Sequence, residues 1–259
     1  MRPDAAVESE AVELTAALVA IDSVNPGLVP GAAGEAAIVE HLRHRLSRGG
    51  FDTHVVQAPG HVGRPSLVAV SPAGAPGPTV VLTGHLDTVG VEGMDDPFGA
   101  RVHGDRLEGR GACDMKGGVA AMVVAAEELA RRRLPGRVVL ALVADEEDAS
   151  LGTLAVLDAL PGLGIEPDVA VIGEPTWLAL AQSLRGYALV EVTLEGRAAH
   201  DVERIDDVAF RLRHLIALLI SNHRVEVNFM KGNITHEVNS HHDHARNPEE
   251  KDVRSRLKN

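Results

Sequence analysis

The stretch TVVLTGHLDT, residues 79–88, decides the fold class of this chain. Its first residues are aliphatic or β-branched and follow Pro78, which predicts a short buried strand. His85 and Asp87 come directly after that strand, where open α/β sheets place their ligand sites. A spacing of two in an extended segment points both side chains to the same side, so Asp87 can orient an imidazole whose other nitrogen binds a metal. A packed or solvated histidine is the alternative.

Further strands and helices alternate with this segment along the chain. Short β-rich runs bounded by Gly, Pro or Asp predict strands at Ser66–Val70, Thr79–Thr83, Val138–Ala144 and Asp168–Ile172. Apolar residues at helical spacing predict helices at Glu8–Asp22, Ile38–Leu46 and Gly117–Arg133. This alternation indicates an α/β domain with a largely parallel sheet. The one-sided alternation from Tyr187 to Glu195 predicts a strand of a second, smaller domain that begins near Gln182.

Composition and charge narrow the class of protein. The chain has 259 residues, of which 45% are hydrophobic and 24% charged, so it can bury a core and is neither disordered nor fibrous. Its formal charge of −12 would repel nucleic acid and suits divalent metals. The apolar run Val119–Ala126 is far shorter than the roughly 20 residues of a membrane-spanning helix. Residues 1–10 do not resemble a secretory signal, and Cys113 is a single cysteine, so we expect a cytoplasmic protein.

A glycine-dense loop, Gly109–Gly118, opens the third predicted helix. Asp114 stands where a dinucleotide-binding fingerprint has its third glycine, and no Gly-Lys-Ser/Thr follows, so a phosphate site is not expected. The two oxygens of Asp114 could instead bridge two metals, with glycines allowing close approach of the backbone. Cys113 beside it could be a soft ligand or a nucleophile, or an inert packing residue.

Two acidic loops follow the next two strands. The four adjacent carboxylates of Asp145–Asp148 repel one another, so a cation is expected beside them. One glutamate of the pair Glu146 and Glu147 could bind a metal while the other acts as general base. Glu174 follows the last of these strands and could complete a metal's ligand set. Each loop alone could be a solvated turn or a helix cap, but such residues after four successive strands are typical of a two-metal hydrolase.

Four motifs in this order resemble the M20 metallopeptidase family, which includes acetylornithine deacetylase, succinyl-diaminopimelate desuccinylase, aminoacylase and carboxypeptidase members. They are TGHLDTV (83–89), GRGACDMKGG (109–118), DEE (145–147) and GEPT (173–176), and the resemblance covers about Glu8 to His200. It implies a zinc-exopeptidase-like three-layer α/β catalytic domain at residues 1–181. It also implies that residues 182–220 begin an inserted α+β lid or dimerisation domain.

The resemblance also implies roles for individual residues. His85 and Glu174 would share one metal, Glu147 would bind the second and Asp114 would bridge both. Asp87 would hold His85, Glu146 would be the general base, and the peptide bond between Asp114 and Met115 would be cis. The implied cofactors are two zinc ions, or cobalt in their place.

The implied substrate is a small N-acyl amino acid or peptide, cleaved at its amide bond by a metal-activated water. The segment Leu194–His200 resembles the family's substrate-side motif, and its His200 would help to hold the developing oxyanion in the active site of a partner subunit. That role implies a homodimer when the lid is complete. No nucleic acid or membrane is expected as a partner.

The chain departs from the family pattern after His200, where a small polar pair and a proline are expected and Asp201–Arg204 stand instead. Asparagine and lysine become frequent in residues 221–259, and we expect a divergent, poorly ordered tail there. His236, His241, His242 and His244 could bind metal, but no periodic apolar face anchors them. A final histidine ligand for the second metal is not recognisable. The alternative to a complete amidohydrolase is therefore a C-terminally truncated or frameshifted, non-catalytic member that at most binds metal.

Overall fold

The computed structural model describes residues 5–181 and three further strands at residues 187–193, 225–229 and 235–241. The chain divides into two compact units, Met1–Leu178 and Ala179–Asn259. The helices of the first unit are α1 (Ala5–Val19), α2 (Ala36–Arg48), α3 (Gly117–Arg132) and α4 (Leu151–Ala159), with short turns η1 (Ala112–Lys116) and η2 (Pro161–Leu163). Its strands are β1 (Asp52–Gln57), β2 (Pro65–Val70), β3 (Thr79–His85), β4 (Arg101–His103), β5 (Arg106–Glu108), β6 (Arg137–Val143) and β7 (Val169–Ile172).

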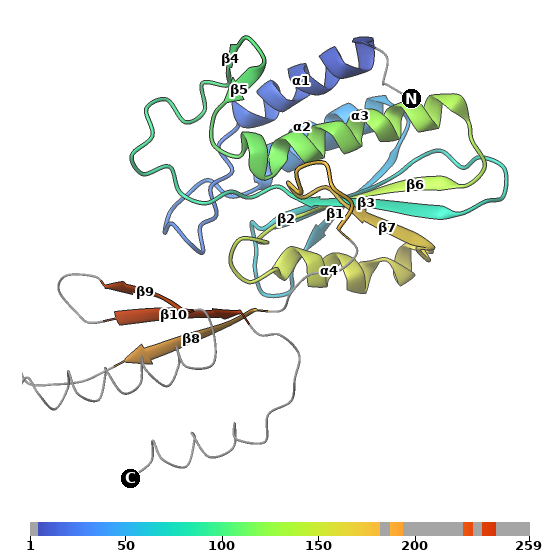
Figure 1. Cartoon of the computed structure of the whole chain (residues 1–259). Coiled ribbons are helices and arrows are strands. Elements are labelled where there is room, and N and C mark those ends of the chain that lie inside the picture. The colour runs from blue at the N-terminus through green and yellow to red at the C-terminus, as the bar shows by residue number, and fades with distance from the viewer. Residues whose placement is uncertain (1–4, 182–186, 194–224, 230–234, 242–259) are drawn as a thin grey trace, which may run out of the picture. The chain divides into compact units, whose positions relative to one another are not determined.

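Five of these strands form one sheet in the order β1-β2-β6-β3-β7 (Figure 1). The strand β3 runs parallel to β6 and β7, whereas β2 runs antiparallel to β1 and β6. The prediction of a largely parallel sheet is therefore wrong, because half of the pairings are antiparallel. The physical reason is the link from β2 to β3: its residues 71–78 form no helix, and a parallel crossover needs a dozen residues or more.

The first unit has three layers, with the sheet between two groups of helices (Figure 1). Leu140 and Leu142 of β6 pack into a core with α1, α2 and α3, while Val139 and Val143 pack into a second core with α4. This follows from the period of two in a strand, which turns neighbouring side chains to opposite faces. Because helices cover both faces of the sheet, β2 and β6 consist almost entirely of apolar residues. The three-layer α/β architecture implied by the sequence is confirmed.

The helix α2 illustrates how the sequence sets the bounds of these elements. Its buried residues Ile38, Leu42 and Leu46 recur every four positions, which is one face of a helix. The helix ends at two glycines: the amide of Gly49 donates to the carbonyl group of Arg45 and the amide of Gly50 to that of Ser47, each at 3.1 Å. Gly50 then adopts a φ of +84°, a left-handed conformation that glycine tolerates best.

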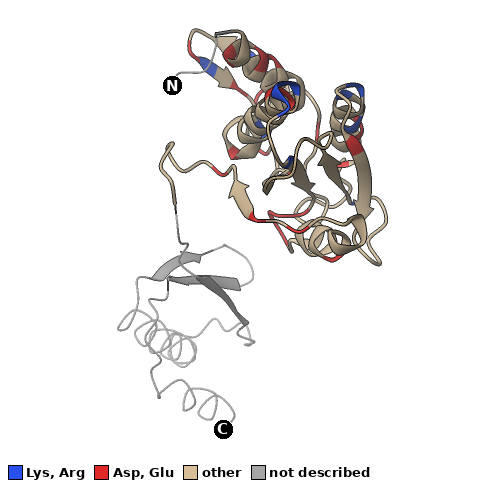
Figure 2. Cartoon of the chain, turned by 90° about the vertical axis from the view of Figure 1, so that its right-hand side faces the viewer, with Lys and Arg blue, Asp and Glu red and all other residues tan. Residues whose placement is uncertain are grey.

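Charged residues lie mainly on the helices and loops of the first unit, and few lie on its central strands (Figure 2). The central strands β2 and β3 contain no Asp, Glu, Lys or Arg, and the central strand β6 contains only Arg137. In the part of the chain that the structure describes, no helix has the length and apolar character needed to cross a bilayer.

The second unit contains a three-stranded antiparallel sheet in the order β8-β10-β9. Its strands are β8 (Tyr187–Thr193), β9 (Val225–Phe229) and β10 (Thr235–His241). Two of them, β9 and β10, lie in the range 221–259, for which a divergent, poorly ordered tail stays a prediction. In the sequence of β9, Val225, Val227 and Phe229 alternate with polar residues in the pattern of a one-sided strand.

Candidate active site

The polar segments singled out in the sequence meet at one edge of the sheet. Because β3, β6 and β7 are parallel, their carboxyl ends lie at the same edge, and His85 of β3 is in register with Val143 of β6. Asp87 and Asp145 each follow two residues later. Gly173, at the end of β7, donates its amide to the carbonyl group of Thr83 in β3 at 3.1 Å. The pairing of three strands thus brings together segments that are distant in the sequence.

The imidazole of His85 is buried, with only 2% of the residue exposed, and both of its nitrogens have polar neighbours. Nδ1 lies 2.9 Å from the backbone carbonyl oxygen of Asp87 and 3.6 Å from its carboxylate oxygen Oδ1. Since a carbonyl oxygen can only accept, Nδ1 carries a hydrogen and Nε2 faces the opposite side. Nε2 lies 2.9 Å from Oδ1 of Asp114 and 3.9 Å from Oε1 of Glu174. Asp87 therefore orients the ring mainly through its backbone.

His85, Asp114 and Glu174 form a group of three donors whose ligand atoms all lie within 4.8 Å of one another. Ligand atoms that share one zinc ion at about 2.0–2.2 Å lie roughly 3–4 Å apart, close to the separations seen around Nε2 of His85. An imidazole nitrogen with two carboxylate oxygens is also a donor set that zinc accepts. Among the residues that the structure describes, this is the one group of three or more such side chains. The residues present therefore fit a divalent metal ion.

The position of Asp114 depends on the packing of the residue that follows it. Asp114 lies in η1, its side chain is 55% exposed, and its peptide bond to Met115 is cis, as the family resemblance implies. Met115 is fully buried, and its sulfur accepts a hydrogen bond from the amide of His85 at 3.2 Å. A Cβ at Gly84 would overlap the Met115 side chain, so this glycine allows the close approach. Burial of Met115 thus sets Asp114 beside His85.

Glu174 is placed by a similar close contact between backbones. A Cβ at Gly118, in the first turn of α3, would overlap the carbonyl oxygen of Gly173. The absence of a side chain at Gly118 therefore lets the segment after β7 approach the loop that carries Asp114. Burial raises the pKa of the Glu174 carboxyl group, the nearby His85 lowers it, and the charges of Asp114, Glu146 and Glu147 raise it further.

Glu146 and Glu147 begin the turn after β6, and Asp87 holds their backbone. The Asp87 carboxylate accepts the amide of Glu146 at 3.0 Å on Oδ1 and the amide of Glu147 at 3.2 Å on Oδ2. Burial raises the pKa of the Glu147 carboxyl group, with further contributions from neighbouring carboxylates, and His85 opposes them. Glu146 is exposed, and neither glutamate belongs to the group of three donors. Asp87 therefore connects the histidine of β3 to the acidic turn of β6.

The electrostatics of the site favour a cation at His85. Burial alone would lower the pKa of His85, but the neighbouring carboxylates of Asp87, Asp114 and Glu174 raise it to about 10. Burial likewise would raise the pKa of Asp87, but the nearby His85 imidazole and the hydrogen bonds from the Glu146 amide and Asn25 lower it. Surplus negative charge around the imidazole is the common cause of both shifts. A divalent metal ion would compensate the same charge.

Four residues that support the site were not predicted as functional from the sequence: the buried Asn25, Glu35 and Asp145 and the partly buried Arg64. Arg64 forms hydrogen bonds to both carboxylate oxygens of Glu35, at 2.8 and 2.6 Å, and lies 2.8 Å from Oδ1 of Asp145. Asn25 donates to Asp87 and Asp145. The sequence signal at Asn25 is the turn-forming run Asn-Pro-Gly at residues 25–27, which indicates only that a helix ends before it. Glu35 and Arg64 carry no local motif that would reveal them.

Other predicted residues lie elsewhere. His200 falls outside the described residues, as do His242 and His244, while His236 and His241 belong to β10. Cys113 is exposed and forms no disulfide.

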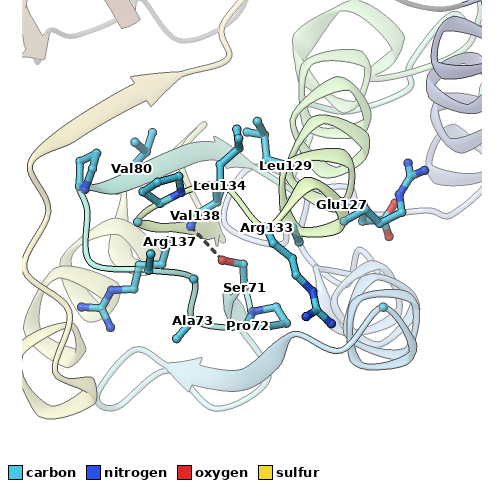
Figure 3. Close-up of a pocket in the computed structure, with 18 residues that line it drawn as sticks. Ser71, Pro72, Ala73, Val80, Glu127, Leu129, Arg133, Leu134, Arg137 and Val138 are labelled. Atoms are coloured by element: carbon cyan, nitrogen blue, oxygen red, sulfur yellow. Dashed lines mark hydrogen bonds between the residues drawn. The ribbon is translucent and has the colours of Figure 1, made fainter.

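A cavity of about 880 Å³ lies at the opposite end of the sheet from the candidate site (Figure 3). It is lined by the loop after β2 and by the segment between α3 and β6, including Ser71, Arg133 and Leu134. Val80 and Val138, near the starts of β3 and β6, also line it. Figure 3 shows the hydrogen bond between the hydroxyl of Ser71 and the amide of Val138, which measures 3.0 Å. None of the predicted site residues lies in this cavity.

Curated relatives are succinyl-diaminopimelate desuccinylases. The chain is 39% identical over 202 residues to that of Gluconobacter oxydans, covering 74% of this chain and 51% of the relative. It is 34% identical over 168 residues to that of Rhizorhabdus wittichii, covering 64% of this chain and 42% of the relative. The chain thus spans about half the length of the curated relatives it matches.

Solved structures of similar fold include an M20 family metallo-carboxypeptidase from Sulfolobus solfataricus. Its TM-score is 0.61 at 14% identity, covering 96% of this chain and 74% of that one. A dinuclear metal binding peptidase of the M20 family from Bacillus subtilis gives a TM-score of 0.57 at 16% identity, covering 92% of this chain and 64% of that one. At these identities the likeness establishes the fold alone.

A family model described as peptidase family M20/M25/M40 matches residues 81–248. The match extends past His200, so the expectation that the resemblance ends there is wrong. The motifs after β3, β6 and β7 and the three-donor group lie in the matched range. The chain belongs to the M20/M25/M40 peptidase family.

Proposed function

We propose that this chain carries the metal-binding part of an amidohydrolase that cleaves the amide bond of a small N-acyl amino acid or peptide. The observation that carries the proposal is the group of His85, Asp114 and Glu174, whose ligand atoms lie within 4.8 Å of one another in a member of a peptidase family. The curated relatives act, by name, on a succinylated amino acid, which favours an acylated amino acid as substrate.

The proposed metal ligands divide between two ions, zinc or cobalt. His85 and Glu174 would hold one ion, Glu147 would hold the other, and Asp114 would be shared by both. When bound, such ions would supply Lewis-acid polarisation of the substrate carbonyl and would lower the pKa of a water molecule. Burial raises the pKa values of Glu147 and Glu174, and the neighbouring carboxylates raise them further, as expected where several carboxylates surround a cation site.

Glu146 is the proposed general base, and its exposed carboxylate is free to move a proton. It accepts a proton from the attacking water and passes it to the nitrogen of the leaving amine, which departs as a neutral amine. Asp87 keeps the hydrogen on Nδ1 of His85 and fixes the backbone of Glu146. Stabilisation of the oxyanion by His200 of a second subunit, and hence a homodimer, belongs to the same proposal.

Cobalt binding and turnover by the full chain test this proposal. Equilibrium dialysis should give close to two Co²⁺ per wild-type chain, and Asp114→Asn should lose most of this binding because it removes the bridging charge. Glu146→Gln should keep its cobalt and lose roughly 10²–10⁴-fold in turnover of N-succinyl-diaminopimelate or N-acetylornithine.

The outcomes separate the parts of the proposal. Wild-type chain without cobalt binding would refute the metal site. Cobalt binding without turnover of any acylated amino acid would instead favour the non-catalytic, metal-binding alternative. Full activity of Glu146→Gln would refute the assignment of the base.

A further inference from the structure

Asn25 lies in the loop between α1 and α2, and it is fully buried with every polar atom of its amide in use. Its Nδ2 donates to Oδ2 of Asp87 at 2.7 Å and to Oδ1 of Asp145 at 3.1 Å. Its Oδ1 accepts the amide of Gly27 at 2.8 Å and Nη2 of Arg64 at 3.0 Å. An amide has two donor hydrogens and two acceptor sites, so this side chain is saturated.

The two carboxylates that Asn25 contacts belong to different strand ends. Asp87 follows β3 and orients His85, whereas Asp145 follows β6 and precedes Glu146 and Glu147. Asp145 has a φ of +64°, a left-handed conformation that is uncommon outside glycine, although aspartate adopts it more readily than most residues. Its carboxylate is held by Arg64 and by Asn25, which stabilise this turn.

The backbone around Asn25 is attached to the same two segments. The amide of Asn25 donates to the carbonyl group of Thr88 at 2.8 Å, one residue beyond Asp87. A Cβ at Gly27 would overlap the carboxylate of Asp148, so the turn at 25–27 packs directly on the acidic turn. The loop therefore contacts both strand ends through its backbone as well as through the side chain of Asn25.

We propose that Asn25 is a positioning residue that fixes the strand end after β3 against the turn after β6, and so sets Glu146 and Glu147 relative to His85. The consequence of this positioning for catalysis rests on the proposed function. Buried hydrogen-bond partners of metal-binding segments typically contribute 10–100-fold in metal affinity or activity. Asn25 is suited to this role because a neutral amide donates to two carboxylates without adding a charge.

Amide hydrogen exchange of the metal-free full chain is the first test. Asn25→Ala should raise the exchange rates of the Glu146 and Glu147 amides by about tenfold or more, because their acceptor Asp87 loses its support. If Asn25→Ala does not fold, the same measurement is made on Asn25→Gln, which keeps the amide but displaces it by one methylene group and should also raise the exchange rates. Unchanged exchange at both amides in a folded variant would overturn the proposal.

A matched control separates positioning from general loss of stability. Ser71→Ala removes a hydrogen bond to the amide of Val138 at the opposite end of the sheet (Figure 3). It should leave the exchange of Glu146 and Glu147 and the cobalt affinity as in the wild type. Equal effects of Ser71→Ala and Asn25→Ala on these amides would assign Asn25 a structural role only and overturn the proposal.

Cobalt binding is the second readout. Asn25→Ala should raise the dissociation constant for Co²⁺ by 10–100-fold and change the visible absorption of the bound ion. Wild-type chain that binds no cobalt would refute the proposed function, while the exchange experiment would still decide the role of Asn25. Wild-type cobalt affinity in an Asn25 variant with altered exchange would overturn the link to the metal site.

Discussion

Replacing Arg64 by methionine should destabilise the first unit far more than any replacement of a surface arginine. The guanidinium group contacts Glu35 at 2.8 and 2.6 Å and Asp145 at 2.8 Å. The side chains of Glu35 and Asp145 are 0% and 1% exposed, so water cannot replace the lost partner. The pKa of Arg64 is raised, chiefly by its hydrogen bonds to Glu35, which reflects the strength of these contacts.

The magnitude follows from the number of buried carboxylates left without a cation. Removing one partner of a buried ion pair costs about 3–5 kcal/mol, because the remaining charge has no compensation. Since Arg64 neutralises two carboxylates, we expect Arg64→Met to lower the free energy of unfolding by an amount near the upper end of this range, about 5 kcal/mol. That is a large share of the 5–15 kcal/mol typical of a domain, and it corresponds to a fall in Tm of roughly 10–20 °C.

Urea unfolding of wild type, Arg64→Met and Arg43→Met measures this effect. Arg43 is the matched control: it contacts both oxygens of Glu40 at 2.8 and 2.7 Å, but the two side chains are 39% and 61% exposed. Its replacement should leave the urea midpoint unchanged, because solvent-exposed ion pairs contribute little. Equal midpoints for the two variants would refute the reasoning that burial, and not bidentate geometry, gives Arg64 its importance.

Two further predictions concern other buried positions. Gly152→Ala places a Cβ against the backbone of Ala144 and should lower the free energy of unfolding, measured in urea, by about 1–3 kcal/mol. A Cβ at Gly162 meets nothing within 4 Å, so Gly162→Ala should leave this free energy unchanged. Similar losses of stability in the two variants would contradict this reasoning. Burial lowers the pKa of Lys116 from 10.5 to about 8, so the folded chain releases this proton before the unfolded chain does, and the contribution of Lys116 to stability rises between these pH values. From pH 7 to pH 10, wild type should therefore gain about 2.5 kcal/mol in free energy of unfolding relative to Lys116→Met. A change of opposite sign would show that the pKa of Lys116 is not lowered by folding.

The strands that carry the site could be predicted from the sequence because each is a continuous apolar run. The edge strand β1 was missed, since its sequence DTHVVQ is half polar and its exposure is typical of an edge. The helix α4 was missed because nine residues from Leu151 are too few to establish a period. The direction of β2 was also missed, because an apolar run carries no information about its orientation in a sheet.

The candidate ligands could be chosen from sequence because His85, Asp114 and Glu174 each stand in a polar segment beside an apolar element. The hydrogen-bond network of Asn25, Glu35, Arg64 and Asp145 that supports these ligands could not be predicted from the sequence. Arg64 and Glu35 are 29 residues apart, and Glu35 accepts the amide of Asp145 across 110 residues. Contacts of that kind arise only from the sheet topology, so no local pattern of residue types encodes them.

The register between β3 and β6 has a consequence for how the protein folds. A slip of one residue would move the acidic turn by about 3.3 Å relative to Asp87 and reverse the faces of every side chain in the strand. The Asp87 carboxylate could then no longer accept the amides of Glu146 and Glu147. The register of one strand pair is therefore fixed a second time by two side-chain hydrogen bonds outside the sheet, which join residues 59 and 60 positions apart in the sequence.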